Sequence, residues 1–162
     1  MARMTFKAGD EYALKLSRLA AGADEIAKKA IYAAADIVAD EIGKNIDALP
    51  TESFRYLRDG DKFSGVPGQQ KQDLKDSFGI TPISLDGDGN WNAKIGFDGY
   101  GSTPTKAYPQ GLPNQLLARA IESGSSVRQK TPFVRPAVNA TKKQAQTEMA
   151  RVIDEETAKT MK

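Results

Sequence analysis

The sequence predicts an α+β fold, in which a long N-terminal helix and a C-terminal helix pack on a small antiparallel β-sheet (a hairpin), with two long loops. Three observations support this prediction. Apolar residues recur with helical spacing over residues 10–49, two β-type segments flank a glycine-rich turn at 86–90, and a second helical pattern closes the chain. Helices on one face of a hairpin form an α+β layer arrangement. The 162 residues suit a single domain, 1–162.

The first helix is expected to begin at Asp10, which is a good N-cap, and Glu11 adds a charge that the helix dipole favours. Gly22 is a point where the path can bend and Asp24 can cap a second segment, so one long helix and two consecutive helices both fit. The helical pattern is expected to end just before Pro50, because the residue before a proline resists the helical conformation. The apolar face comprises Leu14, Leu16, Leu19, Ile26, Ala30, Ala33, Ala34, Ile37 and Ile42.

Residues 51–72 and 98–113 are rich in glycine, proline and charge, and are expected to form long flexible loops. The first loop carries Phe54, Tyr56 and Phe63. Aromatic residues in a loop often dock onto a partner, but they equally often attach the loop to its own domain. The sequence leaves both interpretations open.

The segments 78–85 and 91–97 suit the two strands of a β-hairpin around the turn DGDGN. Proline cannot donate a ladder hydrogen bond. Pro82 therefore predicts an edge position or a bulge in the first strand.

The turn also contains Asp86, Asp88 and Asn90 at the spacing that opens a calcium-binding loop. The sixth position of such a loop should be Gly and is Trp91, and the twelfth should be Glu and is Phe97. A hairpin turn explains the same residues and is the preferred interpretation.

Asn114 can cap a short helix, NQLLARAIES, that stops at Gly124. Residues 125–136 are expected to be extended, and the final helix to start around Pro136. Residues 155–162 are expected to fray. The apolar stripe of this last helix comprises Val138, Ala145, Met149, Val152 and Ile153.

The chain has no cysteine and no histidine, which excludes a Cys/His zinc site, a thiolate nucleophile and a Ser-His-Asp triad. Two carboxylate pairs, Asp73 with Asp76 and Glu52 with Asp59, offer acid–base chemistry, but neither stands in an apolar setting. We therefore predict no catalytic residue, no metal ligand, no cofactor and no enzymatic activity, with a small carboxylate-based hydrolase as a minor alternative.

The net charge is +2, and the basic residues form no dense block of the kind found in nucleic-acid-binding arms. The N-terminal sequence lacks the apolar run of a signal peptide, and no stretch of about 18 apolar residues suggests a membrane span. The sequence predicts a protein made in the cytoplasm, without a membrane partner.

Three segments resemble a known family. QDLKDSFGI at 72–80 resembles the T-G-x-L-x-x-S-I element of the head–tail joining or tail-completion proteins of long-tailed bacteriophages, a tail-component family of lambdoid phages. AIESGSS at 120–126 is similar to the family's A-x-x-V-E-x-G-T stretch, and KTPFVRPAV at 130–138 to its Q-P-F-L-R-P-A-L. Gln72 and Ser125 depart from the family's Gly and Thr. The matching residues that define the structural motif are Leu74, Glu122, Phe133, Arg135 and Pro136.

The resemblance implies a structural, non-enzymatic protein that assembles at the phage head–tail junction and forms a ring, commonly a hexamer. Its implied partners are other neck and tail proteins: connector, stopper, tail terminator or tail tube. Its implied location is the host cytoplasm during assembly, then the virion. The candidate partner-interface residues on this interpretation are Phe54, Tyr56, Phe63, Tyr100 and Tyr108.

Two alternatives stay open: a minor tail component, and a neck protein that contacts the passing DNA without sequence specificity through Arg55, Arg58 and Lys62.

The third motif also has a physical interpretation. Pro132 and Pro136 are expected to hold Phe133 and Val134 in an extended conformation just before a helix. Arg135, between the two prolines, is expected to pair with a carboxylate such as Glu122. Phe133 and Arg135 are therefore expected to stabilise the fold.

Overall fold

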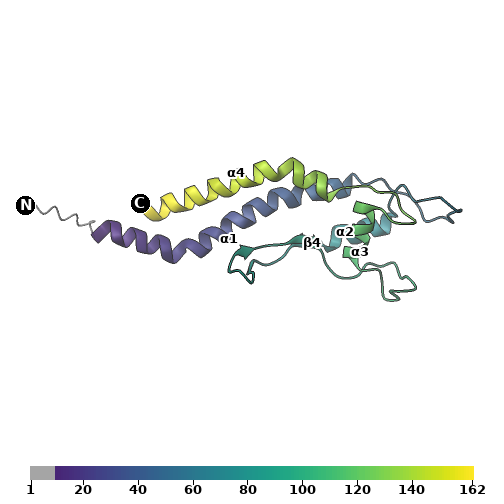
Figure 1. The fold of residues 1–162 in the computed structure, drawn as a ribbon, viewed down its shortest axis with the longest axis horizontal. Helices are drawn as coiled ribbons and strands as arrows, with labels where there is room; N and C mark the ends of the chain where they lie inside the picture. Colours follow the sequence, from purple (N-terminus) through teal and green to yellow (C-terminus); the bar gives the residue numbers. More distant parts are fainter. Residues whose placement is uncertain (1–9) are drawn as a thin grey trace, which may run out of the picture.

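The computed structural model describes residues 10–162 and shows the predicted α+β fold (Figure 1). Two long helices lie side by side as an elongated arm. The tip of the hairpin lies beneath the middle of this arm, where Trp91 donates to Asp24, and the other short elements gather beneath and beyond one end of it. The elements in chain order are α1 (Asp10–Asp47), α2 (Gly68–Ser77), β1 (Phe78–Ile80), β2 (Ser84–Leu85), β3 (Trp91–Asn92), β4 (Ile95–Phe97), α3 (Asn114–Ser123) and α4 (Val134–Met161).

The first of the two long helices, α1, is continuous, which decides between the two expected arrangements in favour of one helix. Gly22 lies inside it without ending it, and the helix stops at Asp47, ahead of Pro50 as expected. The helix begins at Asp10, but the expected capping role of that side chain lies outside the described residues.

Together α1 and α4 form the arm, in which they run antiparallel, with the C-terminus of α4 beside the first half of α1 (Figure 1). Small residues line the contact: Ala30 and Ala34 of α1 are buried, as are Ala137 and Ala145 of α4. Alanine lets two helices approach closely but buries little apolar area. An ion pair between Lys29 and Glu156, 2.7 Å, joins the helices farther along.

The core lies where α1 meets α2, α3, β4 and the start of α4. Its five largest fully buried side chains come from four different segments: Ile46, Leu74, Leu117, Ile121 and Phe133. The Phe97 and Phe133 rings meet nearly edge to face, with centroids 6.0 Å apart. This single cluster joins all the short elements except β2 and β3 to the arm.

The expected hairpin forms, but as two short antiparallel ladders. Pairing of Phe78–Ile80 with Ile95–Phe97 is followed by pairing of Ser84–Leu85 with Trp91–Asn92. The interruption contains Pro82, as its missing donor predicted. Across it, the Thr81 N–H still donates to the Lys94 carbonyl at 2.8 Å.

The segment 86–90 is a turn, as predicted. The Asp86 N–H donates to the Asn90 carbonyl at 2.9 Å, and Gly89 has φ +80°. Oδ1 of Asp86 accepts the N–H groups of Asp88 (2.9 Å) and Asn90 (2.8 Å), so its carboxylate closes the turn.

The first loop is shorter at its C-terminal side than the predicted range 51–72. Residues 68–72 are helical and open α2, so the irregular connection runs only from residue 48 to residue 67. This helix buries Gln70 and Leu74 alone, so it has no apolar stripe that periodicity could detect. The second loop, 98–113, is irregular as predicted.

The short helix α3 has the predicted bounds and ends at Gly124, which adopts φ +79°. Its N-cap is Pro113, so the prediction that Asn114 caps it was wrong. The Asn114 side chain instead donates to the Asp98 carbonyl at 2.9 Å.

The final helix starts two residues earlier than predicted, at Val134, and Pro136 lies in its first turn. The expectation of an extended Phe133 and Val134 was wrong, because Val134 is helical and Phe133 has φ −135° and ψ −26°. Pro136 alone predicted where the helix starts, and an external cap, described below, allows an earlier start.

The C-terminal end of α4 is helical to Met161, so the expected fraying of 155–162 is contradicted. Ion pairs that link Arg151, Glu155, Glu156 and Lys159 line this end, with Lys29 of α1 joining them. The predicted stripe is correct in part. Ala145 is buried, and Met149 and Val152 are half-buried, whereas Val138 and Ile153 are exposed; Ala137 and Thr141 are buried but were not predicted.

Candidate partner interface and its supports

The three segments that carry the family resemblance meet at Glu122 and Phe133. Glu122 of α3 accepts the backbone N–H groups of Phe133 (2.7 Å), Val134 (2.8 Å) and Arg135 (3.0 Å). Since α4 has no side-chain cap of its own, a carboxylate from another helix satisfies its first donors. Burial raises the pKa of Glu122, but these three donors and the charge of Arg135 outweigh it and leave the pKa below its ordinary value.

Arg135 contacts Glu122, but not through its side chain as predicted. Arg135 is exposed, and it is its backbone N–H that binds the carboxylate. Of the other motif residues, Leu74 and Phe133 lie in the core, as expected for residues that hold the fold together.

In the first loop, the Glu52 carboxylate joins separate parts of the loop by accepting their hydrogen bonds, and we call it the clasp. Its Oε2 accepts the N–H groups of Ser64 (2.7 Å) and Gly65 (3.0 Å), while Oε1 accepts Nε of Arg55 at 2.9 Å. The Arg55 bond, with these backbone donors, lowers the pKa of Glu52 to about 2. A Cβ at Gly65 would lie 2.9 Å from the Glu52 backbone nitrogen, so only glycine fits beside the clasp.

Phe63 is the aromatic residue that attaches this loop to its own domain. It is 7% exposed, its N–H donates to the Val127 carbonyl at 2.9 Å, and the Gln129 N–H donates to its carbonyl at 2.8 Å. The Phe54 ring packs edge-on against it at 5.9 Å between centroids. Of the two interpretations that the sequence left open, attachment therefore applies to Phe63.

The other four candidates are exposed. Tyr56 is 90% exposed, Tyr100 68%, Phe54 57% and Tyr108 36%. Both loops that carry them lie at the end of the molecule opposite the C-terminus (Figure 1). We call these four residues the aromatic end.

Arg128 is a supporting residue that the sequence analysis missed. It is 8% exposed, and its guanidinium donates to the Gly65 carbonyl at 3.1 Å and to Oε1 of Gln70 at 2.9 Å. Burial lowers the pKa of Arg128. No pattern in the sequence distinguishes this arginine from the exposed ones, because its partners are a distant carbonyl and an amide.

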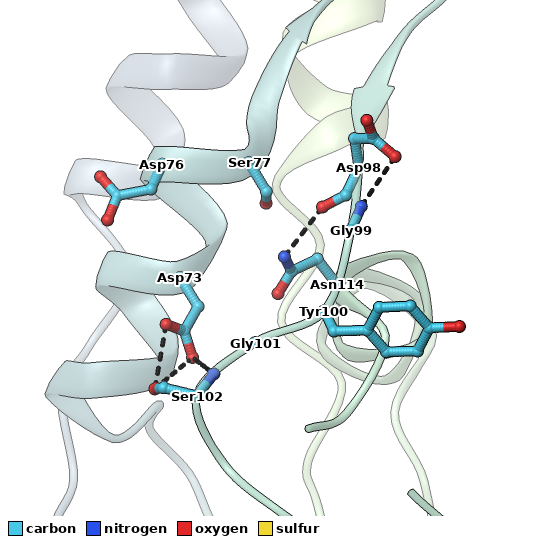
Figure 2. Close-up of a pocket in the computed structure, with 9 residues that line it drawn as sticks. All are labelled: Asp73, Asp76, Ser77, Asp98, Gly99, Tyr100, Gly101, Ser102 and Asn114. Carbon is cyan, nitrogen blue, oxygen red and sulfur yellow. Dashed lines mark hydrogen bonds between the residues drawn. The ribbon is translucent and has the colours of Figure 1, made fainter. Parts of the chain in front are cut away.

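The second loop is fastened to α2. The Asp73 carboxylate accepts the Ser102 N–H at 2.9 Å and its hydroxyl at 3.0 Å (Figure 2). The Gly101 N–H donates to the Leu112 carbonyl at 2.8 Å, which closes the base of the loop. At Gly111, with φ +123°, a Cβ would lie 1.9 Å from the Gly101 carbonyl oxygen. The two sides of the loop can therefore come into contact here only if residue 111 is glycine.

The carboxylates considered for acid–base chemistry make structural contacts. Asp73 holds Ser102, Asp76 accepts the Gln72 amide at 2.7 Å, and Glu52 is the clasp. Over residues 10–162, no three or more Asp or Glu side chains gather as a metal site would require. Within the same residues, no helix is long and apolar enough to cross a membrane.

The bases proposed for DNA contact are interleaved with acids. Arg55 pairs with Glu52 (2.9 Å) and Asp61 (3.6 Å) and lies 5.6 Å from the centre of the Phe63 ring. Arg58 and Lys62 are exposed. The loop therefore presents little net positive charge.

Comparison of the chain with protein-family models, curated proteins and solved structures finds no match.

Proposed function

We propose that this chain is a structural, non-enzymatic assembly protein of the tailed-bacteriophage head–tail junction, where copies form a ring that binds other neck and tail proteins. On this proposal it is made in the host cytoplasm and becomes part of the virion. The observation that supports the proposal most is the meeting of the three family-like segments. They are separated along the chain, yet their residues Leu74, Ile121 and Phe133 pack in one core cluster.

Glu122 adds a specific contact to this packing. The glutamate of the second segment caps the backbone of the third through three N–H groups. A chance likeness between short segments would not require them to fit together in this way. Three of the residues that carry the resemblance, Leu74, Glu122 and Phe133, therefore hold the fold together.

The arm supplies a surface suited to self-association. Near its free end, Tyr12 (53%), Leu14 (52%) and Leu16 (44%) of α1 are exposed, and Ile153 (41%) of α4 is exposed as well. Exposed apolar side chains along paired helices are typical of subunit contacts, and a ring needs one such contact repeated around an axis. The aromatic end then remains available for neighbouring neck or tail proteins.

Light scattering and particle recruitment test the proposal together. We expect the purified chain to reach the mass of a closed ring as its concentration rises, or to bind particles of one type only, either tail-less heads or head-less tails. A chain that stays monomeric and ignores both particle types at high concentration would contradict the proposal.

Two variants test whether the aromatic end or the arm binds the particles. Tyr56→Ala removes a side chain that is 90% exposed and should lower recruitment to particles about tenfold, the usual scale for losing an interface aromatic, without changing the fold. Tyr12→Ala removes an exposed aromatic from the surface proposed for self-association, so it should raise the concentration needed to form the ring; once the ring has formed, its recruitment should equal that of the native chain. Equal effects of both variants would rule out the aromatic end as the docking surface.

The runner-up function is DNA contact through the first loop. It predicts binding to random-sequence DNA that weakens steeply with salt and is lost in an Arg58→Ala, Lys62→Ala double variant. The acidic neighbours of these bases argue against it, and absence of binding at low salt would exclude it.

A further inference from the structure

An open pocket of about 650 Å³ lies between α2, the segment after β4 and the start of α3 (Figure 2). Three carboxylates, those of Asp73, Asp76 and Asp98, belong to its lining, and the described residues that line it include no lysine or arginine. None of the three takes part in the ion pairs found within residues 10–162. The pocket is therefore strongly acidic on a chain whose net charge is +2.

Asn114 gives this pocket a second, independent feature. Its side chain is almost wholly buried at 3% exposure, and its nitrogen donates to the Asp98 carbonyl at 2.9 Å. Its oxygen, Oδ1, is buried and has no donor within the described part of the chain. Figure 2 shows that this oxygen lies on the side of the pocket that faces Asp73. A buried acceptor without a donor is costly, so it indicates a missing partner.

Two acceptors pack closely against Gly101. A Cβ there would lie 2.8 Å from Oδ2 of Asp73 and 3.0 Å from Oδ1 of Asn114, so both oxygens, which come from two different helices, lie next to the same glycine. Asp73 already accepts the Ser102 N–H, the Ser102 hydroxyl and, at 3.4 Å, the Gln69 side-chain amide, but a carboxylate has capacity for further donors. A side chain at position 101 would clash with both oxygens, so glycine is needed to keep them side by side in the pocket wall.

We propose that the pocket binds the guanidinium group of an arginine side chain that a partner protein presents. A guanidinium has five N–H donors in one plane and no acceptor, which matches a lining of separated acceptors. The three carboxylates supply the opposite charge, and Tyr100, which is 68% exposed, also belongs to the lining.

A bare metal ion fits less well. Calcium requires several oxygens about 2.3–2.6 Å from one point. The carboxylates of Asp76 and Asp98 turn away from Asp73 in Figure 2, and no cluster suited to a metal exists within the described residues. This chemistry does not depend on the proposed role at the head–tail junction, and its failure would leave that role untouched.

The test uses the full-length chain labelled with ¹⁵N and a capped Gly-Arg-Gly peptide as the probe. We expect millimolar binding that shifts the backbone amide signals of Gly99, Gly101 and Ser102, and shifts the side-chain amide of Asn114. The same peptide with citrulline in place of arginine keeps the length and planarity but lacks the charge, and it should produce no saturable shift.

Variants localise the site. Asp76→Asn and Asp98→Asn preserve an oxygen for the bonds from the Gln72 amide and the Gly99 N–H, so the fold should survive. Together they should weaken peptide binding about fivefold to tenfold, in proportion to the charge removed. Asp40→Asn changes an exposed carboxylate on α1 and should leave binding unchanged.

Three results would overturn the proposal. The citrulline peptide could bind as well as the arginine peptide, the double variant could bind with unchanged affinity, or the shifts could map away from Gly101. Calcium chloride alone producing saturable shifts of the same signals, and blocking the peptide, would identify a metal site instead.

Discussion

At the scale of single residues, carboxylates fasten distant parts of the chain by accepting backbone N–H groups. Glu122 caps α4 from α3, Glu52 closes the first loop on Ser64 and Gly65, and Asp73 holds the second loop at Ser102. In the sequence these residues are indistinguishable from ordinary surface acids. Their roles follow from which N–H groups the fold leaves without partners, and that is a property of the tertiary structure.

Glu122 yields a stability prediction. Glu122→Ala should lower the free energy of unfolding by about 2 kcal/mol, and Glu122→Gln by about 1 kcal/mol, because neutral hydrogen bonds to a helix end are roughly half as strong as charged ones. Urea denaturation measures both values. Asp40→Ala, at an exposed position on α1, is the control and should change stability by less than about 0.5 kcal/mol.

Acid should remove this contribution. The pKa of Glu122 in the folded chain lies below its ordinary value of 4.5. Protons therefore bind the unfolded chain more readily, and the stabilisation is complete above pH 4.5 and disappears as the pH falls through the folded-state pKa. The stability difference between the native chain and Glu122→Gln should shrink over that range. A difference that stays constant down to pH 3 would show that the carboxylate charge is irrelevant to the cap.

At the scale of elements, apolar periodicity correctly predicted α1, α3, most of α4 and the hairpin, and the missing donor of Pro82 predicted the interruption between its two ladders. It failed at α2, where one buried leucine cannot establish a period, and at the start of α4, where the cap comes from Glu122 in another helix. It also failed at the end of α4, where packing against α1 and ion pairs stabilise residues that look like a frayed tail.

The candidate site was predictable only in part. The sequence located the exposed aromatics Phe54, Tyr56, Tyr100 and Tyr108 by their loops, but it could not separate them from the buried Phe63. The acidic pocket around Asn114 was not foreseen, since it forms from three segments that no local pattern connects.

The second loop predicts a large effect from a small substitution. Gly111→Ala should destabilise the chain by about 3 kcal/mol or more, since a Cβ there would overlap the Gly101 carbonyl oxygen and the positive φ disfavours alanine. Gly43→Ala, inside α1 with no neighbour near the added methyl, should instead stabilise by about 0.5–1 kcal/mol. Thermal or urea unfolding distinguishes the two. Similar values for both variants would mean that the loop does not close at Gly111.

At the scale of the whole molecule, stability is unevenly distributed. The core cluster lies at one end of the molecule, and α1 extends away from it (Figure 1). Farther along α1, Lys29 forms an ion pair with Glu156, near the end of α4. The described side chains before Gly22 are exposed or only half-buried. The free end of the arm therefore has few buried contacts within residues 10–162, and the proposed ring would supply more.

Hydrogen exchange should reveal this gradient. In the monomer, backbone amides of residues 11–22 should exchange far faster than those of residues 30–46, because helix segments without buried apolar contacts open locally while core segments open only with global unfolding. On assembly into the ring, residues 11–22 should become protected.

In a Leu14→Ser, Leu16→Ser variant, the monomer's unfolding midpoint should be unchanged but the protection on assembly should be lost, since both side chains are exposed in the single chain. Slow exchange of residues 11–22 in the monomer would show that the arm is stable alone and would remove the reason to expect a subunit contact there.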